Sequence, residues 1–282
     1  MPTYQEALKI NEQYALDNDK EPSAVKILLL HFSKLSSSQL IEKFTEEMDH
    51  NTYQHFLKAV DQYIIKNRPI QHITETEHFY GYQFYVNHQV LIPRFETEEL
   101  VGYALDFKKT YFGDNPISLI DLGTGSGCLA ITLNLEDPSI KSEGTDISEE
   151  AVKIAKQNAK KLNANVTFYQ GDLYKPINGK KYDMLISNPP YIPNNEEVEP
   201  IIKDYEPHIA LFGGEDGLDY YRAILKDAEN YLNDKYIIAF EHTYDKAKAI
   251  KKLCKKYLKD IRIIQKKDMQ GHDRMTFIFK EE

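Results

Sequence analysis

A glycine-rich segment follows an apolar stretch in the run Ile120-Asp121-Leu122-Gly123-Thr124-Gly125-Ser126-Gly127. Glycine lets a backbone turn tightly and approach a ligand without a Cβ clash, and the start of a following helix offers unpaired N–H groups. The spacing is G-x-G-x-G, whereas the dinucleotide-binding fingerprint G-x-G-x-x-G would need glycine in place of Cys128. The segment is therefore interpreted as a loop that cradles the amino-acid part of S-adenosylmethionine, with an ordinary glycine turn as the alternative. The expected cofactor contacts are Gly123, Thr124, Gly125, Ser126 and Gly127.

Two acidic residues end the next two apolar stretches. Asp146 closes the run Glu143-Gly144-Thr145-Asp146, nineteen residues after Gly127, and Asp172 closes Tyr169-Gln170-Gly171-Asp172. An acid at the first position can accept hydrogen bonds from both ribose hydroxyls of a nucleoside. The second acid is placed for an adenine amino group. A lone aspartate after a strand is usually a helix cap, but three sites in chain order at three strand ends favour a cofactor site.

The run Asn188-Pro189-Pro190-Tyr191 directly follows the fourth apolar stretch. Methylating an amide or exocyclic amino nitrogen is difficult because its lone pair is delocalised. A site for this reaction must accept both N–H hydrogens and so aim the lone pair at the methyl group. The Asn188 side-chain oxygen and the Pro189 carbonyl can be those acceptors, the prolines keep the segment rigid, and Tyr191 offers a flat face for a planar group. We expect Asn188, Pro189 and Tyr191 to be catalytic and Asn188 to Tyr191 to bind the substrate, a simple Asn-Pro turn being the alternative.

The segments around these motifs alternate between apolar and amphipathic runs, which indicates strands alternating with helices. Such alternation predicts a mostly parallel sheet with helices on both faces, and two last strands with little helix between them predict an antiparallel edge. The expected strands are residues 117–122, 140–146, 166–170, 182–187, 236–240, 261–265 and 275–279. The expected helices are residues 97–107, 129–135, 148–162, 218–232 and 245–257.

The chain before the sheet has a different character. Residues 1–75 show helical apolar spacing, no alternation with period two and no catalytic motif, which predicts a small helical bundle used for packing or partner recognition. Aromatic and β-branched residues around Gly81 predict a hairpin linker over residues 76–95. The methyltransferase domain is then expected over residues 96–282.

Composition narrows the possible functions. Lys and Arg number 35 against 44 Asp and Glu, a formal net charge of −9, which disfavours a nucleic-acid partner unless positive charge is concentrated in one place. Two cysteines form neither a disulfide framework nor a zinc site, and the histidines lack metal spacing, so we expect no metal and a cytoplasmic location. The start MPTYQEALKI lacks the features of a signal peptide, and no apolar run approaches the ~20 residues of a membrane helix.

Taken together, these motifs resemble those of the release factor glutamine methyltransferases, the HemK/PrmC family. The resemblance covers nearly the whole chain and includes Val90 to Arg94, Glu96 to Glu98, Asp121 to Gly127, Asn188 to Ile192, Tyr205 to Pro207, Ala210-Leu211, Gly213 to Leu218 and Gly271 to Arg274. It implies an α/β, class I S-adenosylmethionine-dependent methyltransferase sheet, Rossmann-like with seven strands and an antiparallel edge, plus a small N-terminal helical domain.

The resemblance also implies an activity. The family transfers a methyl group from S-adenosylmethionine to the side-chain amide nitrogen of the glutamine in the Gly-Gly-Gln motif of peptide chain release factors, which act in translation termination. By this likeness Gly123 to Gly127, Asp146 and Asn188 bind the cofactor, and Asn188 to Tyr191 hold the glutamine. The chain departs from the family pattern at Phe95, at Leu173 and at Glu241-His242-Thr243, where relatives usually have Glu-Ile-Gly.

Other methyltransferases remain alternatives. A glutamine methyltransferase acting on a ribosomal protein would share the same site. Nucleic-acid amino-methyltransferases use the same acceptor device but need a basic groove, and the only dense basic run, residues 251–256, is better interpreted as the solvated face of a late helix. A binding module that kept only the fold would be expected to have lost its acceptor residues, which are intact.

Overall fold

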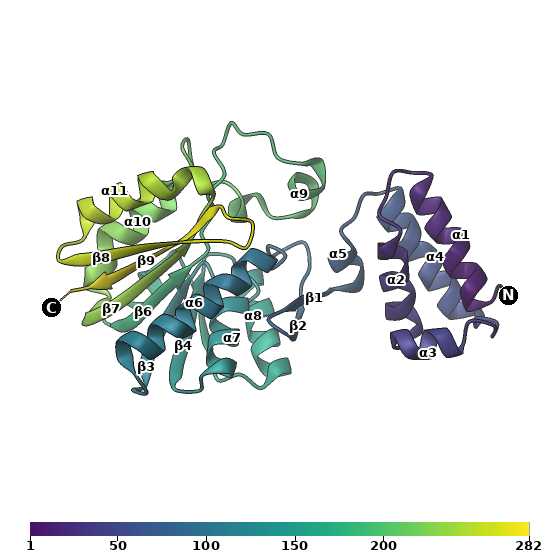
Figure 1. Ribbon diagram of the computed structural model, residues 1–282, viewed down its shortest axis with the longest axis horizontal. Helices are drawn as coiled ribbons and strands as arrows, with labels where there is room; N and C mark the ends of the chain where they lie inside the picture. The colour runs from purple at the N-terminus through teal and green to yellow at the C-terminus, as the bar shows by residue number, and fades with distance from the viewer. Residues whose placement is uncertain (282) are drawn as a thin grey trace. The chain divides into compact units, whose positions relative to one another are not determined.

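A computed structural model describes residues 1–281 of the protein, which form two compact units (Figure 1). The smaller unit contains Met1–Thr76 together with the short segment Pro200–Tyr205. The larger unit contains Glu77–Glu199 and the chain from Glu206 onward. The boundaries 1–75, 76–95 and 96–282 inferred from the sequence stay a prediction.

The smaller unit is helical, as its apolar spacing predicts. Side-chain caps begin several helices: Thr3 and Ser36 each form a capping box, and Asp49 accepts from two backbone N–H groups. The apolar faces then close around a core that includes Leu28, Leu29 and Phe56, all fully buried. Its helices are α1 (Tyr4–Leu16), α2 (Ser23–Ser33), α3 (Ser37–Glu42), α4 (His50–Ile64), α5 (Ile70–Thr74) and α9 (Pro200–Tyr205).

A tight hairpin of β1 (Thr76–Phe79) and β2 (Tyr82–Tyr85) follows the first helices. Its two-residue turn has positive φ at both Tyr80 (52°) and Gly81 (81°), the backbone that matches the twist of paired strands. The rings of Phe79 and Phe84 meet edge to face with centroids 6.0 Å apart and belong to the core of the larger unit.

The larger unit contains a seven-stranded sheet in the order β5-β4-β3-β6-β7-β9-β8, with β9 antiparallel to both of its neighbours and the other strand pairs parallel. This arrangement confirms the predicted sheet with its antiparallel edge. The strands are β3 (Ile117–Leu122), β4 (Ile140–Asp146), β5 (Thr167–Gln170), β6 (Tyr182–Ser187), β7 (Leu232–Glu241), β8 (Ile261–Lys267) and β9 (Asp273–Lys280).

Helices cover both faces of the sheet (Figure 1). One apolar core joins the sheet to α6 (Phe95–Phe112), α7 (Cys128–Glu136) and α8 (Glu149–Leu162). A second core, on the other face, joins it to α10 (Asp219–Asp227) and α11 (Ala247–Tyr257). Because both faces are buried, the central strands are nearly continuous apolar runs.

Some element bounds differ from the sequence prediction. The helix expected over residues 218–232 ends at Asp227 and continues only as the 3₁₀ turn Ala228–Asn230, because Leu232 already pairs with Tyr182 as the start of β7. The helix expected from residue 245 begins as the 3₁₀ turn Tyr244–Lys246. The first helix of the larger unit is longer than expected, since α6 runs over Phe95–Phe112.

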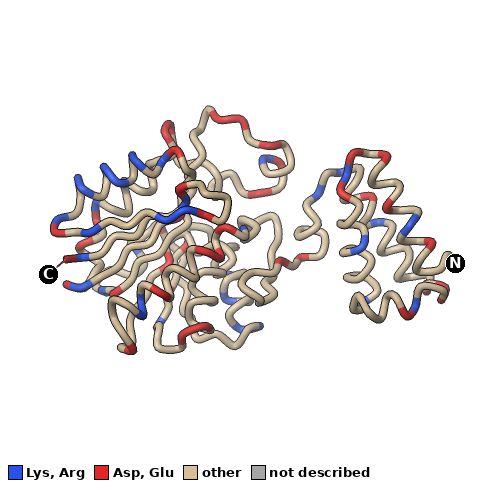
Figure 2. Tube along the Cα trace, in the orientation of Figure 1, with Lys and Arg blue, Asp and Glu red and all other residues tan. Residues whose placement is uncertain are grey.

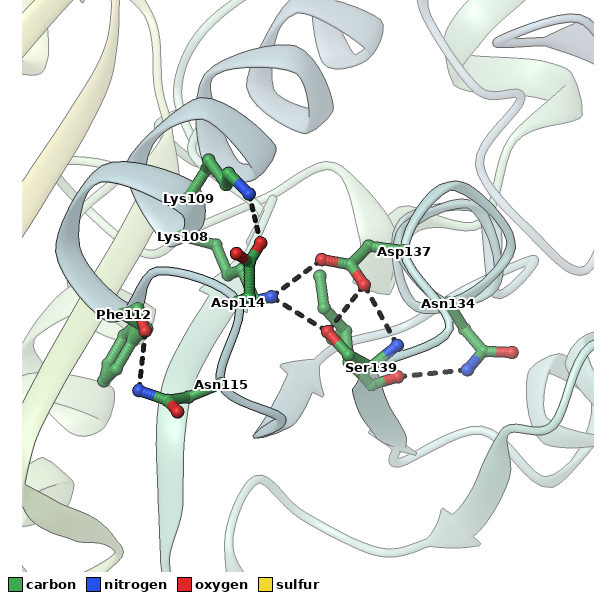
Figure 3. A network of polar contacts seen from close by, with 9 residues as sticks. Lys108, Lys109, Phe112, Asp114, Asn115, Asn134, Asp137 and Ser139 are labelled. Atoms are coloured by element: carbon green, nitrogen blue, oxygen red, sulfur yellow. Dashed lines mark hydrogen bonds and ion pairs between the residues drawn. The ribbon is translucent and has the colours of Figure 1, made fainter.

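A buried lysine anchors α6 at the edge of the sheet where the parallel strands begin (Figure 3). Lys108 is 2% exposed, and its Nζ lies 2.8 Å from both Asp137 Oδ2 and Ser139 Oγ. A buried charge needs such partners because desolvation is costly. The network directly precedes β4. It therefore lies at the amino ends of the parallel strands, whereas the motifs lie at their carboxyl ends.

The solvent-exposed face of α11 is basic. Basic residues follow α11 in Figure 2, and within the run 251–256 every lysine is exposed while Cys254 is buried. An amphipathic helix with a solvated basic face accounts for this run. Within residues 1–281 no helix is long and apolar enough to cross a membrane.

Candidate active site

The motifs meet at the carboxyl ends of the parallel strands, around a cavity of about 210 Å³. Parallel strands place these ends at one edge, where open α/β sheets bind their ligands. Of the residues predicted to act, those that line the cavity are Gly123, Thr124, Gly125, Ser126, Asp146, Asp172, Asn188, Pro189 and Pro190. Gly127 and Tyr191 are not among the lining residues.

The glycine loop connects β3 to α7 through a backbone that other residues rarely adopt. Gly123, Gly125 and Gly127 all have positive φ, at 74°, 55° and 82°. Gly127 has a packing role, because a Cβ there would lie 2.9 Å from Ile131 Cδ1 and 3.1 Å from Phe168 Cζ. Gly125 has open space around it and its backbone N–H points to Asp146. The loop thus combines one close-packing glycine with others that face the cavity.

A buried carboxyl group braces the loop from beneath. Asp121 is fully buried at the end of β3, and Thr124 Oγ1 donates to its Oδ2 at 2.6 Å. Burial raises the pKa of Asp121 to about 7, although the Thr124 hydrogen bond opposes the shift. We predicted no role for Asp121 from the sequence, and in the structure it lies behind the loop and not in the cavity lining.

Asp146 holds the loop in place as well as lining the cavity. Its Oδ2 accepts from the Gly125 N–H and its Oδ1 from the Ser148 N–H, both at 2.9 Å. Burial raises the pKa of this carboxyl group, and the two backbone hydrogen bonds oppose that shift. Each carboxylate oxygen has a second lone pair, so the residue can still accept from ligand hydroxyls.

Asp172 stands after the end of β5, on the rim of the cavity. Its Oδ2 forms an ion pair with Lys175 Nζ at 2.8 Å, and nearly half of the Asp172 side chain is exposed. The preceding Gly171 is tightly placed, since a Cβ there would lie 2.9 Å from the Pro176 ring. The structure thus puts Asp172 in reach of a ligand in the cavity, and its expected contact with adenine stays a prediction.

The Asn188-Pro189-Pro190-Tyr191 segment begins directly after β6. Asn188 is half-buried, and its Nδ2 donates to Thr97 Oγ1 at 3.3 Å. Tyr191 packs against the second apolar core, and burial raises the pKa of its hydroxyl above the ordinary range. The first three residues of the segment therefore face the cavity, while Tyr191 is not part of its lining. The role of Tyr191 as a flat face for the substrate stays a prediction.

Glycines of a later segment support this acceptor segment. A Cβ on Gly213 would lie 2.4 Å from the Pro190 carbonyl oxygen, and one on Gly217 would lie 2.1 Å from the Tyr191 carbonyl oxygen. In the same two segments, Ile192 forms a parallel β-bridge with Phe212. Only residues without a side chain allow two backbones so close. The sequence showed Gly213 and Gly217 but not the contact they permit.

An ion pair beside the cavity joins two segments that lie far apart in the sequence. Arg94 Nη2 is 2.5 Å from Glu206 Oε1, and the Glu206 side chain is only 2% exposed. Burial raises the pKa of Glu206, and the Arg94 charge opposes that rise. Arg94 lines the cavity together with Pro207 and Ile209. The pairing ties the start of α6 to the loop before α10.

Glu241 is a further site residue that sequence reasoning missed. It ends β7, next to the end of β6, and is 2% exposed. Burial raises its pKa to about 7, while the nearby Thr97 hydroxyl and the Arg274 charge oppose the rise. An acid ending an otherwise apolar strand is the signal that could have identified it.

The arrangement suits a nucleoside-bearing ligand and a second, planar polar group. Acids at the ends of β4 and β5 can accept from hydroxyl and amino groups, and the glycine loop opens toward the cavity. Asn188 and Pro189 supply acceptor oxygens beside that ligand site. Within residues 1–281, no cluster of three or more His, Cys, Asp or Glu side chains is arranged to hold a metal ion.

Two curated relatives with the same name match this chain over nearly its whole length. Release factor glutamine methyltransferase of Bacillus cereus is 39% identical over 276 residues, covering 96% of this chain and 97% of the relative. The Bacillus subtilis protein of that name is 38% identical over 279 residues, covering 97% and 96%.

More distant matches agree on the fold. The family described as methyltransferase small domain matches residues 110–205. A solved methyltransferase structure from Pyrococcus furiosus is similar in fold, with a TM-score of 0.54, 18% identity and coverage of 83% of this chain and 100% of that one.

Proposed function

Because the chain belongs to the release factor glutamine methyltransferases, we propose that it methylates the glutamine of the Gly-Gly-Gln motif in peptide chain release factors. It is an S-adenosylmethionine-dependent methyltransferase. The observation that carries the proposal is that Asn188 and Pro189 line the same cavity as the glycine loop and Asp146.

Residues of the cavity fit the cofactor. The glycine loop would hold its amino-acid part, Asp146 its ribose hydroxyls and Asp172 its adenine amino group. Bound S-adenosylmethionine supplies an electrophilic methyl group on a sulfonium. Asp146 already fixes the loop through the Gly125 N–H, so this part of the site is preorganised.

The acceptor residues would orient the glutamine amide. The Asn188 side-chain oxygen and the Pro189 carbonyl accept its two N–H hydrogens, which aims the nitrogen lone pair toward the methyl group. Pro189 and Pro190 have no N–H to compete for these acceptors. Most of the rate enhancement would then come from orientation and the exclusion of water.

The helical segment 1–75 is proposed to recognise the protein substrate, with residues 76–95 as a linker and 96–282 as the methyltransferase domain. The segment carries no cavity residue, and its helices form their own core. A role in partner recognition is consistent with both observations.

The partner is proposed to be protein, with no direct nucleic-acid or membrane contact, and the location cytoplasmic. The net charge of −9 supports a protein partner over a nucleic acid. A ribosomal protein is the nearest alternative substrate, because its glutamine would present the same amide.

The test is methyl incorporation from labelled S-adenosylmethionine into three separate substrate classes: release factors, ribosomal proteins and nucleic acids. We expect label in release factors alone. Label in ribosomal proteins or nucleic acid, with none in release factors, would overturn the proposal. The Asn188→Ala variant serves as the control for labelling that does not depend on the site.

A further inference from the structure

The larger unit exposes few large apolar side chains, and these gather near the cavity. Within residues 77–199 and 206–281 the large apolar side chains that are exposed range from 49% to 74% exposed, and they are Phe95, Ile147, Ile209, Tyr244 and Met269. Single exposed apolar residues are normal on a protein surface, but several of them gathered in one region mark an interaction site. Their positions in the fold therefore indicate what they could bind.

Two of the five residues line the cavity itself. Ile147 directly follows Asp146 at the end of β4, so bound S-adenosylmethionine would cover it. Ile209 lines the cavity from the segment before α10, together with Arg94 and Pro207. The cofactor residues proposed above do not include this segment, so a different molecule is needed to cover Ile209.

The other three residues lie close together beside the start of α6 (Figure 1). Phe95 begins α6, and the Met269 backbone N–H donates to Glu99 Oε1, one helical turn after Phe95, at 3.1 Å. The centroid of the Tyr244 ring lies 5.5 Å from that of His272, which belongs to the same turn between β8 and β9 as Met269. These contacts join the three exposed side chains into one continuous region.

The turn that carries Met269 has a fixed shape. The Asp268 side chain is only 1% exposed and accepts from the backbone N–H groups of Gln270 and His272 and from Arg274 Nε at 3.0 Å. A surface that is already ordered loses little conformational entropy when a partner covers it. The turn is therefore suited to binding another molecule.

Ile209 adjoins the same region. Its segment is held on one side by the ion pair of Glu206 with Arg94, the residue that directly precedes Phe95. On the other side Phe212 forms the β-bridge described above. Ile209 and Phe95 thus belong to one surface beside the cavity.

We propose that Phe95, Ile209, Tyr244 and Met269, here called the apolar patch, dock the part of the release factor that flanks the methylated glutamine. The glutamine side chain can reach Asn188 only if the backbone that carries it lies beside the cavity, so the adjoining substrate surface must cover this region. Aromatic residues and methionine are enriched at protein interfaces. A second copy of the chain on the patch would obstruct the cavity that the substrate must enter. The inference rests on the proposed function, in which Asn188 holds the glutamine.

The test compares steady-state methylation of an intact release factor by wild-type protein and by the double variant Phe95→Ala/Met269→Ala. Truncating two side chains that a partner covers should raise the KM for the release factor about tenfold or more. The kcat and the affinity for S-adenosylmethionine should change by less than about twofold, because neither residue lines the cavity. Tyr244→Ala should raise this KM about threefold or more. Lys109→Ala is the matched control, since Lys109 is exposed in the last turn of the same helix, and its KM should stay unchanged.

A KM within about twofold of wild type in both the double variant and Tyr244→Ala would overturn the inference, and so would a loss confined to kcat. If the double variant does not fold, Tyr244→Ala decides alone. Sedimentation tests the other occupant: we expect no difference between wild type and the double variant, whereas a wild-type dimer that becomes a monomer in the variant would assign the patch to a second copy. A wild-type protein that labels no release factor would instead reject the proposed function.

Discussion

At the scale of single residues, the cavity lining is supported by buried carboxyl groups that do not themselves face it. Asp121 stands beneath the glycine loop and Glu241 behind Asn188. The sequence predicted the lining residues Asp146 and Asn188, because each sits in a motif at a strand end. It could not predict that Thr97 contacts Asn188, because the two residues are far apart in the chain and meet only in the folded protein.

The acceptor role of Asn188 predicts a large loss on its removal. Asn188→Ala should lower single-turnover methylation about a hundredfold or more, or ~3 kcal/mol, since one preorganised partner of the transition state is lost. Asn188→Asp should be less harmful because a carboxylate still accepts. Cofactor affinity, measured by calorimetry, should change little. A near wild-type rate in Asn188→Ala would show that the segment is only a rigid turn.

The ribose role of Asp146 predicts weaker cofactor binding. Asp146→Ala should lower the affinity for S-adenosylmethionine by about 1–3 kcal/mol, because charge-assisted hydrogen bonds are lost and the Gly125 N–H is left without its acceptor. Isothermal titration measures this directly. Asp114→Ala, at an exposed ion pair outside the cavity, is the control and should bind normally. Unchanged affinity in Asp146→Ala would remove the residue from the site.

The raised pKa values of Asp121 and Glu241 predict how stability depends on pH. Both groups have a folded-state pKa of about 7, above the ordinary values of 3.8 and 4.5. The folded state therefore keeps protons that the unfolded state has lost between about pH 4.5 and 7. The free energy of unfolding should therefore decrease as the pH rises from about 4.5 to 7, by on the order of 1 kcal/mol per pH unit for each group.

Urea unfolding at several pH values tests this slope. Asp121→Asn and Glu241→Gln cannot titrate, so each variant should show a shallower decrease than the wild-type protein between about pH 4.5 and 7. An equal slope in all three proteins would mean that these two carboxyl groups keep ordinary pKa values.

At the scale of elements, the site depends on which strand ends lie next to each other. The alternation of strands and helices predicted the parallel sheet and its antiparallel edge, because buried strands and amphipathic helices have distinct periods. The periodicity of apolar residues did not predict where some helices end. Leu232 continues an apolar helical pattern in sequence, yet its pairing with Tyr182 makes it the start of β7. Tertiary pairing overrides local propensity there.

The contact between two loops predicts a sensitive glycine. Gly213→Ala should displace the acceptor segment, because the new Cβ would lie 2.4 Å from the Pro190 carbonyl oxygen, and backbone cannot yield as a flexible side chain can. We expect a stability loss of about 1–3 kcal/mol and reduced methylation. Gly102→Ala within α6 is the matched control: its Cβ meets only Tyr80 Oη at 4.0 Å, so the helix should gain up to about 1 kcal/mol. Equal stability in both variants would contradict the close packing.

At the scale of the whole molecule, the residues that line the cavity and the N-terminal helical segment belong to separate compact units. Both cores of the larger unit begin at Phe79 or later, and the cavity lining begins at Gln89. The helical spacing of apolar residues over 1–75, without a catalytic motif, predicted a helical bundle. Nothing in the sequence indicated that Pro200–Tyr205 would group with it, because that contact joins segments far apart in the chain.

This division predicts the effect of deleting residues 1–75. The remaining protein should bind S-adenosylmethionine with near wild-type affinity, since every proposed cofactor residue lies at Gly123 or later. Methylation of an intact release factor should fall strongly because the proposed recognition helices are gone. Calorimetry and methyl incorporation measure the two effects. Full-rate methylation by a folded truncated protein would remove the recognition role.

The most direct test of the central claim is to identify the methylated atom. A release factor incubated with the wild-type protein and labelled S-adenosylmethionine would be digested, and the labelled peptide sequenced by mass spectrometry. We expect one methyl group on the side-chain amide of the Gly-Gly-Gln glutamine, and no label when that glutamine is replaced by glutamate. Label at any other residue, or label that persists in the glutamate variant, would contradict it.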